Sequence, residues 1–305
     1  MTLRNTLTVR APAKINLHLG VGAPREDGFH PLTSVYQAVG VYDDLTVVDD
    51  DGWSVDVTVS DWMDRDHVPL DGDNIVDRAA ALLAAHHGSA VSGKLHIDKA
   101  IPVAGGMAGG SADAAAALVA LDRLWGANTS DDDLLALAAQ LGSDVPFALL
   151  GGTALGTGRG ELVERVRDDG TWWWVAVIDT EGMSTPAVYR HFDELNPDAD
   201  PEPPAADDLL EAIHTGDVDL LAASLRNDLQ EAAFDLRPSL SDVIDRGERE
   251  GALRGLVSGS GPTCVFLTES ADAAREVAGA FTADGHEVVL VTHGPVAGAH
   301  VVTYA

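Results

Sequence analysis

Four glycines lie within residues 105–110, directly ahead of an alanine-rich segment. Glycine lets the backbone adopt positive φ and come close to a ligand. Ser111, which follows these glycines, is a good N-cap residue and predicts a helix over 112–125. The free amides and the positive end of the helix dipole would then face whatever lies over the glycines. Phosphate is the ligand that suits this arrangement.

The two best-known phosphate loops have other patterns. The Walker A loop ends in Gly-Lys-Ser/Thr, and no lysine follows these glycines. The dinucleotide fingerprint reads G-x-G-x-x-G, whereas this segment reads G-G-x-x-G-G. A glycine cluster by itself is equally typical of a flexible turn ahead of a helix. Its meaning therefore depends on the residues around it.

Two charged residues in apolar surroundings could act beside such a loop. Lys14 lies in a segment predicted as a strand over 6–19, where an uncompensated ammonium group would be costly. Asn16 lies two residues further on, and so on the same face of the strand. Asp144 precedes Pro146, which fits the first turn of a helix whose amides would keep the carboxylate ionised. Taken alone, Lys14 also fits a lysine extending from an edge strand, and Asp144 fits a helix cap.

Three segments together resemble the GHMP kinase superfamily of galactokinase, homoserine kinase, mevalonate kinase and phosphomevalonate kinase. Residues 102–115 are similar to its phosphate loop, 11–17 to its N-terminal motif and 257–266 to its C-terminal glycine motif. The resemblance implies an α+β protein with two domains. The expected division is a ribosomal-protein-S5-like ATP-binding domain in 1–160 and a ferredoxin-like substrate-binding domain in 161–305.

Within that superfamily, residues 14–17 and 25–31 are similar to the branch that serves the non-mevalonate isoprenoid pathway. This resemblance implies transfer of the γ-phosphoryl group of ATP to the 2-hydroxyl of 4-diphosphocytidyl-2-C-methyl-D-erythritol, with Mg²⁺ between the phosphates. A homoserine or mevalonate type kinase is one alternative, and residues 25–30 argue against it. A non-catalytic nucleotide-binding sensor of the same fold is another, and the presence of both Lys14 and Asp144 argues against it.

The resemblance also implies roles for individual residues. Lys14 and Asp144 would be the catalytic pair, with Asp144 as the base that accepts the hydroxyl proton. Ser111 would be a ligand of Mg²⁺. The nucleotide-binding residues would be Asn74, Pro102, Val103, Ala104, Gly105, Gly106, Met107, Ala108, Gly109, Gly110, Ser111 and Ala112. In the last of these positions the family usually has a second serine.

The expected substrate-binding residues are Asn16, Phe29, His30, Thr185 and Tyr189. In the resembled branch an aromatic ring stacks on cytosine and the neighbouring histidine forms hydrogen bonds with it. A second aromatic residue, here Tyr189, closes the other side. Phe29 stands where the family often has Tyr, so stacking would persist without a hydroxyl contact. The alternatives without a binding role are that Phe29 fills the core, that His30 is a solvated loop residue and that Tyr189 packs against a helix.

Composition limits the class of protein. The chain has 305 residues, enough for two domains, and no apolar run of about 18 residues. Its N-terminal segment lacks the apolar centre of a signal peptide. A net charge of −30 makes nucleic acid and anionic membranes unfavourable partners. The single Cys264 cannot form an internal disulfide; it is either a nucleophile or a small buried residue. We expect a cytoplasmic monomer or weak homodimer whose partners are small molecules.

Three further patterns predict local structure. Alternating apolar residues predict a β-hairpin over 44–59, and Asp73 or Asn74 is expected to cap the next helix. Residues 253–292 predict the order strand, strand, helix, strand, which suits a ferredoxin-like domain. Lys99, just ahead of the glycines, could contact phosphate or be an ordinary exposed lysine.

Overall fold

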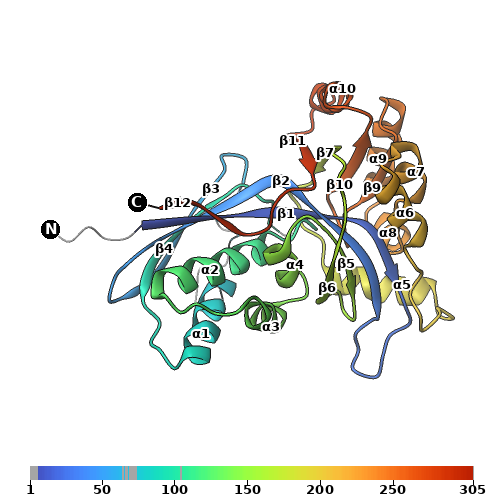
Figure 1. The fold of residues 1–305 in the computed structure, drawn as a ribbon. Coiled ribbons are helices and arrows are strands. Elements are labelled where there is room, and N and C mark those ends of the chain that lie inside the picture. Colours follow the sequence, from blue (N-terminus) through green and yellow to red (C-terminus); the bar gives the residue numbers. More distant parts are fainter. Residues whose placement is uncertain (1–5, 64, 66–67, 69–73, 104, 305) are drawn as a thin grey trace.

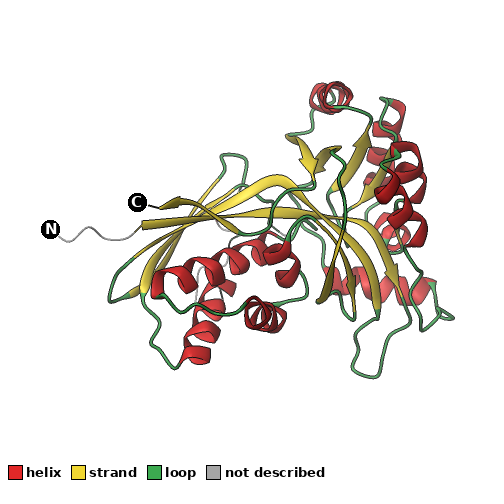
Figure 2. Cartoon of the chain, in the orientation of Figure 1, coloured by secondary structure: helices red, strands yellow, loops and turns green. Residues whose placement is uncertain are grey.

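The computed structural model describes residues 6–63, 65, 68, 74–103 and 105–304. In this part of the chain two β-sheets lie next to each other, each accompanied by its own helices (Figures 1 and 2). The predicted Ala104 contact falls outside the described residues.

The first sheet has a central path in the order β12-β1-β2-β4-β3. Beside this path, β5 pairs with β2 and β6, and β8 pairs in parallel with β1. The first and the last strand of the chain are therefore neighbours in the same sheet, because β12 pairs with β1 (Figure 1). The strands are β1 (Thr6–Val21), β2 (Leu32–Val48), β3 (Trp53–Val59), β4 (Gly93–Lys99), β5 (Thr153–Thr157), β6 (Leu162–Val166), β8 (Arg226–Asn227) and β12 (His300–Tyr304).

The hairpin predicted over 44–59 is wrong. β2 and β3 follow each other in the chain, but β4 lies between them in the sheet. It pairs antiparallel with β2 and parallel with β3. The alternating residues Leu95 and Ile97 of β4 are buried, so the inserted strand contributes an apolar face to the core. An alternating pattern predicts strands, but their partners are set by long-range packing.

Four helices pack against this sheet, on the lower side in Figure 1. α2 buries one face against β1 and β2, because its alanines let the helix approach the strands closely. Asn74 caps α1, as predicted: its side chain accepts a hydrogen bond from the amide of Val76. The helices are α1 (Ile75–His87), α2 (Gly109–Trp125), α3 (Asp131–Leu141) and α4 (Val145–Leu150).

The second sheet has four antiparallel strands in the order β11-β7-β10-β9. The strand-strand-helix-strand order predicted over 253–292 is confirmed, and with β7 it gives the ferredoxin-like arrangement. The strands are β7 (Trp172–Ile178), β9 (Arg254–Val257), β10 (Cys264–Thr268) and β11 (Val288–Gly294). The helices of this half are α5 (Thr185–Leu195), α6 (Asp207–Thr215), α7 (Val218–Ser224), α8 (Gln230–Leu236), α9 (Ser239–Arg249) and α10 (Ala271–Ala283).

Cys264 is buried in β10, with its thiol near the carbonyl of Leu240. Burial raises the pKa of this thiol to about 12, so the structure favours the small buried residue over the nucleophile. Among the described helices, none has the length and apolar character needed to cross a bilayer.

Candidate active site

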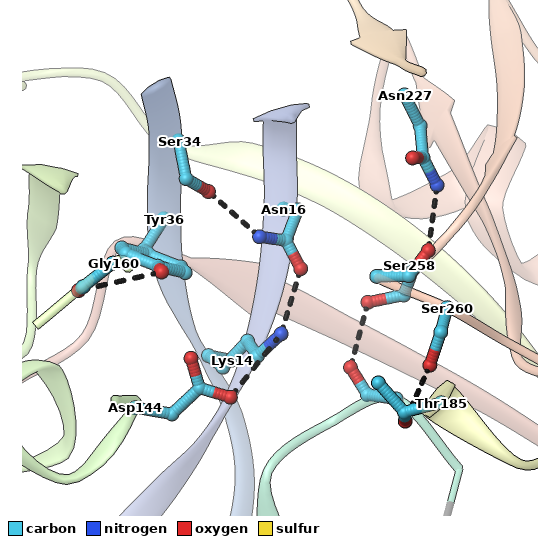
Figure 3. A network of polar contacts seen from close by, with 12 residues as sticks. Lys14, Asn16, Ser34, Tyr36, Asp144, Gly160, Thr185, Asn227, Ser258 and Ser260 are labelled. Carbon is cyan, nitrogen blue, oxygen red and sulfur yellow. Dashed lines mark hydrogen bonds and ion pairs between the residues drawn. The ribbon is translucent and has the colours of Figure 1, made fainter. Parts of the chain in front are cut away.

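Lys14 and Asp144 face each other across the site, as Figure 3 shows. Lys14 Nζ lies 3.6 Å from Asp144 Oδ2. Lys14 is in the middle of β1 and is 7% exposed, whereas the Asp144 side chain, at the start of α4, is 30% exposed. Asp144 makes no side-chain capping bond to α4. The carboxylate is therefore open on one side and held near the ammonium group on the other.

A chain of hydrogen bonds holds Lys14 in place. Its Nζ donates to Asn16 Oδ1 at 2.7 Å, and Asn16 Nδ2 donates to Ser34 Oγ at 2.8 Å (Figure 3). Ser34 Oγ in turn donates to the carbonyl of His18 at 3.0 Å. Asn16 and Lys14 share a face of β1, as their spacing predicts. Because each polar atom in this buried chain has a partner, the position of the ammonium group is well defined.

Two phenols lie near the Asp144 carboxylate. Tyr36, on β2, is buried, and the ammonium group of Lys14 lies 5.7 Å from the centre of its ring. Burial, reinforced by the negative charge of Asp144, raises the pKa of Tyr36 well above its usual value. Burial and Asp144 also raise the pKa of Tyr189. Both phenols therefore stay neutral at physiological pH.

The glycine loop ends where α2 begins. The helix starts at Gly109, and the cap position is Ala108, whose φ of 58° lies in the left-handed region. The prediction that Ser111 caps this helix is therefore wrong, since Ser111 lies within the first turn. The left-handed residue at 108 and the glycine after it let the helix begin three positions earlier than it would with Ser111 as its cap. The amides of this first turn point toward the space above the loop.

The second sheet holds the glycine loop from the other side. Ser258, in the turn between β9 and β10, donates from its hydroxyl to the carbonyl of Gly106 at 3.0 Å (Figure 3). Asn227 Nδ2 donates to the carbonyls of Val257 and Gly259, each at 2.8 Å. Gly106 has a φ of 77°, and a Cβ there would collide with the carbonyl oxygen of Ser258. The loop and the turn therefore fit only with glycine at 106.

β1 contacts the same loop directly. The backbone amide of Lys14 donates to the carbonyl of Met107 at 3.1 Å. Met107 itself is fully buried. The residue that carries the ammonium group is thus hydrogen-bonded to the loop that faces it.

Lys99 lines the cavity, and its contact with phosphate stays a prediction. It is buried, so it is not an exposed lysine, and its Nζ lies 2.7 Å from Asp43 Oδ2 and 2.6 Å from Asp113 Oδ2. Asp43 Oδ1 also accepts hydrogen bonds from the amides of Ala100 and Ile101. This cluster joins the end of β4 to the first turns of α2 beneath the loop.

Aromatic residues gather at the other end of the site. The ring of His30 lies 5.0 Å from that of Tyr189, and His30 is buried. Phe29 is 49% exposed, and the guanidinium of Arg159 lies 4.8 Å from the centre of its ring. Thr185 Oγ1, at the start of α5, shares a hydrogen bond of 2.8 Å with Ser260 Oγ (Figure 3). Phe29 is therefore not a core residue, and His30 is not a solvated one.

One cavity of about 950 Å³ connects both ends. It is lined from the first sheet by Lys14, Asn16 and the glycine loop, and from the second half by α5 and the turn of Ser260. Of the residues predicted to bind ligands, those that line it are Lys14, Asn16, Phe29, His30, Asn74, Pro102, Val103, Gly105, Gly106, Ala108, Gly109, Gly110, Ser111, Asp144, Thr185 and Tyr189.

Met107 and Ala112 were also predicted to bind nucleotide, but both are buried away from the cavity. Their side chains support the loop from below. Sequence reasoning missed other residues of the site, namely Ser34, Tyr36, Asp113, Arg159 and Asp193. Ser34 and Tyr36 lie on one face of β2, opposite β1, and only the register of this pair brings them to Lys14.

Comparison with protein families identifies both halves of the chain. Residues 74–152 match the family described as the GHMP kinases N terminal domain. Residues 209–287 match the family described as GHMP kinases C terminal. The predicted α+β fold of a two-domain GHMP kinase is therefore confirmed. The boundary between 160 and 161 stays a prediction.

Relatives that match the chain over its whole length identify a narrower family than the two domain matches do. The chain is 71% identical over 297 residues to the 4-diphosphocytidyl-2-C-methyl-D-erythritol kinase of Nocardioides sp. strain JS614, covering 97% of this chain and 100% of the relative. It is 53% identical over 308 residues to the enzyme of the same name from Thermobifida fusca, covering 99% and 100%.

Solved structures agree with these relatives. The structure of a 4-(cytidine 5′-diphospho)-2C-methyl-D-erythritol kinase superposes with a TM-score of 0.77 at 32% identity, covering 94% of this chain and 99% of that one. A homoserine kinase from Cytophaga hutchinsonii reaches a TM-score of 0.71 at 19% identity, covering 99% of each chain, and shares the fold alone. The chain therefore belongs to the GHMP kinases and, within them, to the family of 4-diphosphocytidyl-2-C-methyl-D-erythritol kinases, which are ATP-dependent small-molecule kinases.

Proposed function

We propose that this protein transfers the γ-phosphoryl group of ATP to the 2-hydroxyl of 4-diphosphocytidyl-2-C-methyl-D-erythritol, in the non-mevalonate isoprenoid pathway. One observation carries the proposal: the Lys14–Asp144 pair lies in a single cavity between a glycine loop and a cluster of aromatic side chains. The relatives of this name support the choice of substrate. Phosphoryl transfer depends mainly on positioning and on neutralising negative charge.

The glycine loop would bind the phosphates of ATP. The 17-residue helix α2 begins at the loop, and its first amides and dipole favour an anion there. Asn74, at the start of α1, lines the same cavity and is proposed to contact the nucleotide base. With 49 acidic against 19 basic residues in the chain, attraction for ATP must come from such local groups.

Lys14 and Asp144 would act on the acceptor. Asp144 accepts the proton of the 2-hydroxyl, because its carboxylate is partly exposed to the cavity. Lys14 orients this carboxylate and stabilises the charge that develops on the oxygen atoms of the transferred group. Asn16 holds the ammonium group and is itself proposed to contact the substrate.

Phe29, His30, Thr185 and Tyr189 would bind the cytidine end. The rings of Phe29 and Tyr189 offer faces on which a base can stack, and His30 offers a hydrogen bond that distinguishes one base from another. All four residues line the cavity.

We also propose Mg²⁺ as the cation of ATP. The described residues contain no cluster of three or more metal-binding side chains. Nucleotide-bound Mg²⁺ needs only one or two protein oxygens besides phosphate and water, and the Ser111 hydroxyl lines the cavity. The site therefore fits the ion. When bound, Mg²⁺ neutralises charge on the phosphates.

The proposed setting is the cytoplasm, where the protein works as a monomer or weak homodimer. A single buried cysteine and a net charge of −30 support a reducing compartment without nucleic acid partners.

The test is a phosphorylation assay with the purified chain. ATP is offered with 4-diphosphocytidyl-2-C-methyl-D-erythritol, free methylerythritol, homoserine or mevalonate, and product is detected by mass spectrometry. We expect turnover of the cytidylyl substrate alone. Asp144→Ala should lower kcat by at least about 100-fold, the usual size of a general-base effect. Faster turnover of homoserine or mevalonate, or ATP hydrolysis without a phosphorylated alcohol, would overturn the proposal.

A further inference from the structure

His30 and Asp193 form a hydrogen bond between the two halves of the molecule. His30 lies in the loop between β1 and β2, whereas Asp193 lies on α5. His30 Nε2 is 2.8 Å from Asp193 Oδ1. His30 is 8% exposed, while the Asp193 side chain is 34% exposed, and both residues line the cavity.

Aromatic packing fixes the ring of His30. Its centre lies 5.0 Å from the ring of Tyr189 at an angle of 35°, and 6.3 Å from that of Phe192 at 81°. Both neighbours come from α5, the helix that also carries Asp193. With one ring against each of two sides, His30 cannot turn freely, so its two nitrogens are not interchangeable.

The contact decides which nitrogen carries the hydrogen. An ionised carboxylate only accepts hydrogen bonds, so Nε2 must donate to Asp193. In neutral imidazole the other nitrogen, Nδ1, is then an acceptor. Among the residues that the structure describes, none donates a hydrogen bond to Nδ1 of His30. This acceptor is therefore available to a ligand in the cavity.

We propose that Asp193 is a positioning residue that fixes the His30 tautomer and so selects cytosine over uracil. This proposal rests on the proposed function of the site. Cytosine carries an amino group where uracil carries a carbonyl oxygen, and an acceptor at Nδ1 attracts the first and repels the second. A selection of this kind arises because the wrong base leaves two acceptors facing each other.

Two substitutions of Asp193 distinguish an effect of the His30 tautomer from an effect of side-chain size. Asp193→Asn keeps the size, but its amide can either accept from Nε2 or donate to it, so both tautomers become available. Asp193→Glu keeps an acceptor that can hold only the Nε2–H form.

The chain offers a matched control, in which the histidine lies on α5 and its carboxylate partner on α8. His191 Nε2 lies 3.0 Å from Asp235 Oδ2, a second histidine–carboxylate pair at the surface. Neither His191 nor Asp235 lines the cavity. Asp235→Asn makes the same chemical change and the same change of net charge, and it should leave base selection unchanged.

The first measurement is the tautomer itself. Long-range ¹H–¹⁵N correlation spectra of the ¹⁵N-labelled full chain distinguish the Nε2–H form, the Nδ1–H form and the imidazolium ion, and a His30→Gln sample identifies the signal. We expect the Nε2–H form in the wild type and a shift toward Nδ1–H in Asp193→Asn. Either of the other two forms in the wild type overturns the proposal. This result does not depend on the identity of the acceptor alcohol.

The second measurement is base selection. Binding of CDP and UDP is measured by calorimetry, and kcat/KM is compared for the cytidylyl substrate and its uridylyl analogue. We expect Asp193→Asn to reduce the preference for cytidine at least about tenfold. In the Nδ1–H tautomer, Nδ1 of His30 becomes a donor, so it no longer accepts a hydrogen bond from the amino group of cytosine. Asp193→Glu should keep part of the preference. A preference in Asp193→Asn that stays within twofold of wild type overturns the proposal. If instead the wild type prefers CDP but phosphorylates neither substrate, the proposed function fails and the role of Asp193 survives.

Discussion

Lys14 Nζ lies 3.6 Å from Asp144 Oδ2, although 129 residues separate them in sequence; Lys14 is in β1, and Asp144 directly precedes α4. The pair is oriented by Asn16, which binds the ammonium group at 2.7 Å, on the side away from the carboxylate in Figure 3. A fixed cation beside a partly exposed carboxylate is the arrangement from which the predictions about catalysis follow.

Replacement of the cation tests its role directly. Lys14→Met should lower kcat at least about 100-fold, because charge on the transferred group loses its stabilising partner. KM for ATP should change much less, since the glycine loop is untouched. Steady-state kinetics measures both. The control is Arg10→Met on the same strand, which removes an exposed partner of Asp44; kcat close to wild type is expected there. Wild-type kcat in Lys14→Met would contradict the assigned role.

Glycine at 106 should be required for stability. Gly106→Ala places a Cβ against the Ser258 carbonyl at a φ of 77°, and both effects disfavour the folded state. We expect a loss of about 1–3 kcal/mol, measured as a lower Tm. The control is Gly110→Ala in α2, whose Cβ would meet no atom within 4 Å; its Tm should not fall. Equal Tm values for the two variants would contradict the fit between loop and turn.

The buried cluster around Lys99 should contribute to stability. Lys99→Met leaves Asp43 and Asp113 facing each other without a cation, which should reduce the free energy of unfolding by about 3–5 kcal/mol. Urea unfolding followed by circular dichroism measures this. Lys94→Met is the control on the same strand, since the Lys94 side chain, which pairs with Asp50, is 54% exposed and the pair should be worth less than about 1 kcal/mol. Similar losses in both variants would show that the buried cluster has no special role.

The thiol of Cys264 should be inert in the native protein. Burial raises its pKa to about 12 from an ordinary value of 9.0, so almost no thiolate exists at pH 8. Labelling with a thiol reagent should be slow in buffer and complete in urea. Because the thiol of the unfolded chain ionises first, its contribution to stability should be constant below pH 9 and fall as pH rises from 9 toward 12. Rapid labelling without denaturant would contradict this burial.

The sequence determined the parts of the site that are local. The glycine loop, the N-terminal motif and the residues around Asp144 are each recognisable within a few positions, because backbone freedom, helix caps and strand faces are set by neighbours along the chain. The same holds for the strand-strand-helix-strand order over 253–292. Those features, with the resemblance that they carry, were enough to predict the family and its fold.

Tertiary structure decided how these pieces meet. The insertion of β4 between β2 and β3, the burial of Lys99 and the contact of Asp193 with His30 all join residues far apart in the chain. A local sequence pattern cannot predict such contacts, because they form only when segments that are distant in the chain pack together.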